Sequence, residues 1–130
     1  IYIPAQILGC LLGVMLANVF FEHDILELST KNRDGFHIFL SEIIATFGLI
    51  FIIFATQKDG KITIAASVAT YIMAGYWFTS STSFANPAVA IARTFTDSFT
   101  GINYLNTPTY ILAEFLGALI AVYLIKKLIK

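Results

Sequence analysis

Four long apolar stretches constrain the fold of this chain more than any other feature of its sequence. A hydrocarbon core about 30 Å thick is crossed by roughly 20 helical residues, and each stretch is about that long. Backbone groups inside hydrocarbon must be paired within their own segment, so helices are expected. The predicted spans cover residues 1–21, 36–56, 61–79 and 107–129.

The composition of the chain fits a lipid environment. Of its 130 residues, 58% are hydrophobic and 12% are charged, whereas soluble domains carry roughly 45–50% apolar and about 25% charged residues. The formal net charge is zero, so a nucleic-acid partner is not expected. We therefore predict an all-α membrane protein whose main partner is the lipid bilayer.

The distribution of charge predicts how the spans are oriented. The short turn at 57–61 holds Lys58 and Lys61 against Asp59, and the C-terminal end holds three lysines and no acid. The connection at 22–35 holds four acids and two bases. By the positive-inside rule the short turn and the C-terminus are cytoplasmic. We expect a multi-pass protein of the cell membrane, either the plasma membrane or an inner membrane.

The first and last spans resemble each other. Tyr2–Leu11 and Tyr110–Leu119 share six of ten residues at an offset of 108. Two spans separate them, so the repeats cross the membrane in opposite directions, which is typical of transporter and channel folds. The chain begins at Ile1 inside an apolar stretch, so we expect that the first part of the fold is missing.

The segment 80–101 is too polar for a span and too apolar for a free loop, which predicts a re-entrant segment surrounded by protein or water. Within it, Asn86 and Pro87 form a typical helix start, because asparagine is a good N-cap and proline suits the first helical position. A short helix is expected from Ala88 to Phe95. Its positive end and the Asn86 amide would favour neutral solutes over cations and protons.

These features resemble the second half of the major intrinsic protein family, the aquaporins and aquaglyceroporins. The Asn-Pro-Ala triplet follows a Ser/Thr-rich dip and precedes a last span that contains Ala113-Glu114, and the second span contains Ser41-Glu42 at a similar position. The resemblance covers essentially the whole chain. It implies an aquaporin-like right-handed helix bundle, here a partial transmembrane domain over residues 1–130 with four spans and one re-entrant half-helix.

The resemblance also implies what the protein does. The family forms passive channels for water or small uncharged solutes, as homotetramers with one pore per subunit, without enzyme activity or a cofactor. Asn86 would be one of two pore asparagines, and the other would lie in the missing part. No catalytic set and no metal-ligand spacing is found in the sequence.

The chain departs from the family pattern at the selectivity filter. Val89 occupies the position where the family usually carries arginine, and Arg93 follows one helical turn later. Arg93 either replaces that arginine or is a structural charge paired with Asp97 or with carbonyl groups. The two other filter positions implied by the resemblance are the small residues Ala74 and Ser83. A wide filter favours glycerol, or metalloid acids such as arsenous acid (arsenite), over water alone.

Two acids lie inside predicted spans, namely Glu42 and Glu114. Intramembrane acids can form a proton relay, which leaves a proton-coupled secondary transporter as the alternative function. The resemblance instead implies structural acids that accept hydrogen bonds from the re-entrant backbone. A non-functional fragment of a channel is the third possibility.

Overall fold

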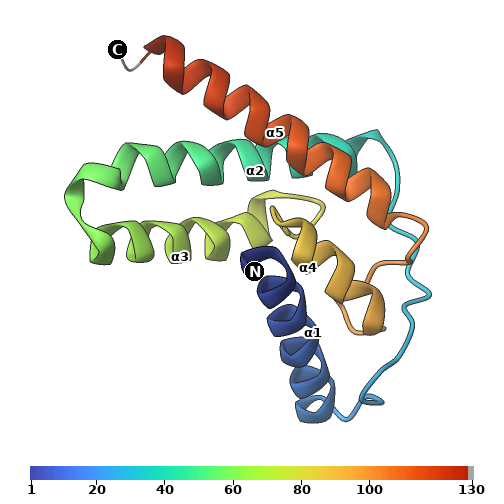
Figure 1. Ribbon diagram of the computed structural model, residues 1–130. Helices are drawn as coiled ribbons and strands as arrows, with labels where there is room; N and C mark the ends of the chain where they lie inside the picture. Colours follow the sequence, from blue (N-terminus) through green and yellow to red (C-terminus); the bar gives the residue numbers. More distant parts are fainter. Residues whose placement is uncertain (129–130) are drawn as a thin grey trace. The chain divides into compact units, whose positions relative to one another are not determined.

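The protein was analysed as a computed structural model, which describes residues 1–128 and contains helices but no strand within that range (Figure 1). Four helices are long and three are short, the short ones including two 3-10 turns labelled η. In chain order they are α1 (Tyr2–Phe20), α2 (Phe36–Thr56), η1 (Gln57–Asp59), α3 (Lys61–Phe78), α4 (Pro87–Ala92), η2 (Arg93–Phe95) and α5 (Thr107–Leu128). The predicted all-α class is confirmed.

The four long helices lie in the four apolar stretches. Three segments are long and apolar enough to cross a membrane, namely Tyr2–Phe20, Phe36–Asp59 and Thr107–Leu128. The helix α3 is not in this set, so the span at 61–79 stays a prediction. Ile129, the last residue of the predicted span 107–129, and Lys130 lie outside the described residues.

The chain forms two compact units, each built from two separate parts of the sequence. The first unit contains Ile1–Asp34 and Asn86–Ile111, and the second contains Gly35–Ala85 and the chain from Leu112 onward. The residues predicted to form the site are divided between them.

In the first unit α1 packs beside the short helix α4 (Figure 1). One side of α1 exposes Leu8, Leu12 and Leu16, which follow one another at the spacing of a single helical face. The polar connection after α1 is held along the segment that follows α4. The backbone N–H of Ser29 donates to the carbonyl oxygen of Thr94 at 2.9 Å, and further backbone hydrogen bonds continue along this connection.

In the second unit α2 and α3 form an antiparallel pair, joined through η1 and Gly60 (Figure 1). Gly60 has a φ of +93°, a conformation that glycine adopts at little cost. The Tyr71 hydroxyl donates to the carbonyl oxygens of Ile44 and Ala45 at 3.2 and 3.0 Å. A Cβ atom at Gly48 would overlap the Tyr71 ring, so the absence of a side chain there lets the two helices approach.

The part of α5 in the second unit also packs closely on α2. A Cβ atom at Gly117 would overlap the backbone oxygen of Ile43. Small side chains fill this region, since Ala45, Ala113 and Ala121 are fully buried. Close approach through small residues is a usual way for helices to associate in lipid.

Candidate functional site

The start of α4 is fixed by the side chain of Asn86. Its Oδ1 atom accepts a hydrogen bond from the backbone N–H of Ala88 at 2.9 Å, and Pro87 occupies the first helical turn. The helix runs to Ala92 and continues as the 3-10 turn η2 to Phe95. The predicted N-cap is therefore confirmed. Ala88 is buried, whereas Val89 is half-buried.

Arg93 begins η2, and its guanidinium forms no ion pair or hydrogen bond with any of residues 1–128. The pairing with Asp97, one of the alternatives considered for Arg93, is not found among these residues. The Asp97 carboxylate instead accepts hydrogen bonds from the Thr30 backbone N–H at 2.9 Å and from the Ser29 and Thr30 hydroxyls. The reason is local: the helix ends at Phe95 and the next residue is extended, so the i, i+4 geometry of a helix is lost.

These hydrogen bonds change the acidity of Asp97. The Thr30 backbone N–H, and then the Thr30 and Ser29 hydroxyls, stabilise the carboxylate and lower the pKa of Asp97 below its ordinary value. The nearby charge of Lys31 acts in the same direction. Asp97 therefore stays ionised and anchors the polar connection to the segment after η2.

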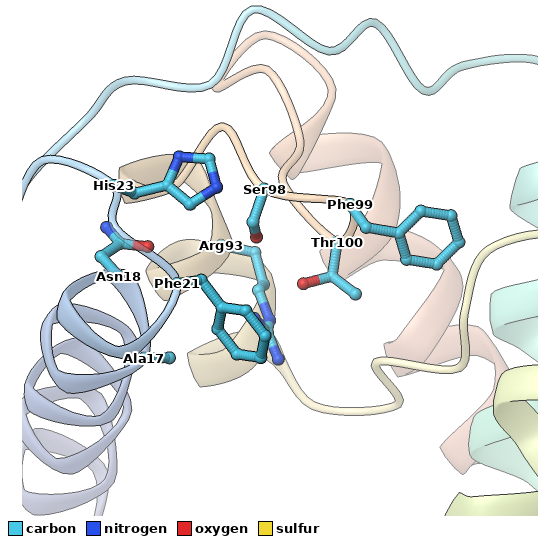
Figure 2. Close-up of a pocket in the computed structure, with 8 residues that line it drawn as sticks. All are labelled: Ala17, Asn18, Phe21, His23, Arg93, Ser98, Phe99 and Thr100. Atoms are coloured by element: carbon cyan, nitrogen blue, oxygen red, sulfur yellow. The ribbon is translucent and has the colours of Figure 1, made fainter.

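Two cavities in the first unit have Arg93 in their walls. The larger, of about 440 Å³, lies between the end of α1 and residues 98–100 (Figure 2). The smaller, of about 210 Å³, is lined by Val89, Cys10 and other residues of α1 and α4. Asn86, Val89 and Arg93 all belong to this unit, and Val89 and Arg93 line the same smaller cavity.

The larger cavity contains a buried polar residue that the sequence analysis did not single out. Asn18 is 2% exposed. Its amide nitrogen donates to the carbonyl oxygens of Phe95 at 3.0 Å and Ile25 at 3.3 Å. A lone asparagine near the end of an apolar stretch was the available signal. Its contacts tie the end of α1 to η2.

In the second unit Glu42 holds the loop that leads to Asn86. Its two carboxylate oxygens accept hydrogen bonds from the backbone N–H groups of Phe84 at 3.0 Å and Ala85 at 2.9 Å. Glu42 is fully buried. These are the contacts that the family resemblance implied for this acid.

The same loop has an unusual backbone. Thr82, Ser83 and Ala85 have φ angles of +68°, +52° and +50°, a region that costs a residue with a side chain about 1–2 kcal/mol. The bonds to Glu42 fix this backbone. Ser83 is buried against Gly75, where an added Cβ would meet its side chain.

The remaining predicted residues also lie in the second unit. Ala74 is exposed on α3 and, together with Ser67 and Thr70, lines an open cavity of about 450 Å³. Glu114 is 1% exposed on α5. Within residues 1–128 there is no group of three or more His, Cys, Asp or Glu residues that could hold a metal ion.

Apolar helices of membrane-crossing length, a short capped helix and a loop fixed by a buried acid define a multi-pass membrane protein. Over 129 residues, which are 99% of the chain, the sequence is 43% identical to Aquaglyceroporin AqpS of Rhizobium meliloti (strain 1021). The chain belongs to the major intrinsic protein family, whose aquaglyceroporins are channels and not enzymes.

The match covers nearly the whole of this chain but only part of the relative. The chain spans 55% of the length of this relative. No protein-family model matches the chain, and no solved structure matches it.

Proposed function

We propose that the protein is a passive transmembrane channel for water and small uncharged solutes. The proposal is supported by the 43% identity to an aquaglyceroporin and by a short helix whose start is capped by Asn86. The whole protein would place this helix start at the middle of the membrane. There it would face a thread of water and solute.

The observation that carries the proposal is the hydrogen bond between Asn86 and Ala88. Because Oδ1 is used as an acceptor within the cap, the orientation of the amide is set and its nitrogen acts as a donor. The positive end of α4 adds to this donor character. Such a site would attract the oxygen atoms of water and alcohols and disfavour cations.

The replacement Asn86→Asp tests the role of this amide. Aspartate caps a helix about as well as asparagine, so the helix start should persist while the donors are lost and a negative charge is added. We expect water and glycerol flux into proteoliposomes, measured by stopped-flow light scattering, to fall by about tenfold or more, which corresponds to about 1.4 kcal/mol.

The matched control is Asn32→Asp, which makes the same chemical change in the exposed connection. Flux through this variant should equal that of the wild type. Equal flux through Asn86→Asp and wild type, at equal protein content, would remove Asn86 from the pore.

The solute class of the proposal is wider than water. Val89 and the small residues Ala74 and Ser83 would leave a wide filter, suited to glycerol or to undissociated metalloid acids such as arsenous acid. The matched relative carries the name aquaglyceroporin. We expect Val89→Arg to reduce glycerol flux more than water flux, and an equal effect on both would contradict a filter at Val89.

The proposed assembly is a homotetramer in the cell membrane, with small neutral solutes as its partners and a cytoplasmic C-terminus. A proton-coupled transporter is less well supported, because the Glu42 carboxylate is engaged by two backbone N–H groups. A channel predicts solute flux with a low activation energy and no response to a pH gradient. Flux driven by a pH gradient would favour the transporter.

A further inference from the structure

We propose that the cavity beside Arg93 in the first unit binds a small, partly protonated oxyanion, of which inorganic phosphate is the simplest example. The proposal does not depend on the proposed pore function, because it rests on the cavity between the end of α1 and residues 98–100, although Arg93 also lines the smaller cavity beside Val89. All the residues that line it belong to one unit.

Arg93 brings a positive charge to the wall of the cavity. Its guanidinium is half-buried and has no acidic or carbonyl partner among residues 1–128. No acid lies among the residues that line the cavity. A half-buried guanidinium without a counter-ion attracts negatively charged groups, so the cavity favours an anion that supplies the missing charge.

The neighbouring acids have other partners, one of which, His23, also lines the cavity. Asp97 accepts hydrogen bonds from Ser29 and Thr30, and Glu27 lies 3.1 Å from Nδ1 of His23. Neither carboxylate therefore neutralises the Arg93 guanidinium. A ligand, and not a side chain of this unit, is expected to do so.

Asn18 has a fixed orientation in the wall of the same cavity. Its amide nitrogen faces two carbonyl oxygens, those of Ile25 and Phe95, so the amide cannot be turned without placing oxygen against oxygen. Figure 2 shows the Asn18 oxygen on the side of the other labelled side chains. The cavity thus presents an acceptor as well as a cation.

Together these groups define the ligand. The Arg93 guanidinium would bind negatively charged oxygen atoms, and tetrahedral oxyanions suit it particularly well. The Asn18 oxygen would accept a hydrogen bond from an O–H group on the same ligand. The hydroxyls of Ser98 and Thr100 can donate to the charged oxygens of the ligand or accept from its O–H group. Hydrogen phosphate has both features, whereas sulfate has no O–H group at neutral pH.

The test is titration calorimetry of the intact protein in maltoside micelles with inorganic phosphate, at neutral pH and constant ionic strength. We expect saturable binding to the wild type, and binding about ten- to a hundredfold weaker for Arg93→Gln, the usual effect of losing one hydrogen bond to a charged group. Arg93→Lys should retain part of the affinity. Lys31→Gln, an equal loss of charge in the exposed connection, should bind like the wild type.

Two further arms identify the source and the chemistry of the ligand. If free phosphate does not bind but nanodiscs containing phosphatidic acid, unlike phosphatidylcholine, stabilise the wild type and not Arg93→Gln, the oxyanion is a lipid headgroup. Sulfate binding as tight as phosphate binding would overturn the role of the Asn18 oxygen. Absence of binding in both arms, or equal binding to Arg93→Gln and wild type, would overturn the site.

Discussion

Glu42 offers the sharpest test of how this fold is held together. The replacement Glu42→Gln keeps the size of the side chain but replaces one of its two oxygen atoms by an amide nitrogen. In the wild type the two oxygens accept hydrogen bonds from the backbone N–H groups of Phe84 and Ala85. In the variant one of these backbone N–H groups would face another donor.

The cost of the change follows from these two contacts. A buried N–H left without an acceptor costs about 1–3 kcal/mol, and the remaining bond loses the extra strength of a charged acceptor. Relief of the desolvation of a buried carboxylate offsets part of this loss. We therefore expect a net destabilisation of about 2 kcal/mol, since Glu42 is fully buried.

Two measurements check this estimate. The melting temperature of the purified protein in micelles should fall by roughly 6–10 °C for a chain of this size. Hydrogen exchange of the Phe84 and Ala85 amides should speed up by about thirtyfold, the factor that corresponds to 2 kcal/mol. Exchange should speed up most in this loop, because the bonds to Glu42 hold the strained backbone of Thr82, Ser83 and Ala85.

Glu27→Gln is the matched control. Its partner is His23 at the surface, with about a third of each side chain exposed, and such pairs contribute little. If Glu42→Gln melts and exchanges like Glu27→Gln, the reasoning about the buried acid is refuted. A proton carrier at Glu42 would give the opposite pattern, in which stability is unchanged and pH-driven flux is lost.

The remaining predictions concern packing and pH. Gly117→Ala should destabilise the protein by about 1–3 kcal/mol, because the new Cβ would overlap the backbone of Ile43. Gly9→Ala, with nothing within 4 Å of its Cβ, should be neutral or slightly stabilising. Equal melting temperatures of the two variants would contradict the close packing of Gly117 on α2. For Asp97 the folded pKa is lowered, so its stabilising contact is present above its unfolded pKa of about 3.9 and is lost as the pH falls through the lower folded value. The NMR shift of the Thr30 amide should report this loss with a midpoint below about 3.9, and a midpoint at the ordinary value would contradict it.

Patterns of neighbouring residues in the sequence predicted the helix start at Asn86 and the positions of the long helices. The order of Asn86 and Pro87 predicts a capped helix start, and the cap involves residues only two positions apart. The four apolar stretches gave the positions of the long helices for the same reason. Local reasoning left two alternatives open for Arg93, and the pairing with Asp97 is not found among residues 1–128 because the helical spacing is interrupted when the helix ends at Phe95.

Contacts between distant residues were beyond the reach of local patterns. Asn18 and Phe95 are separated by 77 positions, and no motif connects them. The bond from Ala85 to Glu42, separated by 43 positions, was expected only because the chain resembles a known family. The cavity beside Arg93 is lined by residues 17–23 and residues 93–100, which are far apart in the sequence. Local patterns could therefore not predict it.

The polar connection after α1 has a practical consequence for labelling. Although it is long and charged, its backbone is bonded to the following segment at Ser29 and again at Lys31, which accepts from Asn103 at 2.8 Å. An epitope tag or fluorescent protein inserted there would have to break these bonds. The turn at 57–60 is fully exposed, so it is the better place for an insertion that leaves the protein intact.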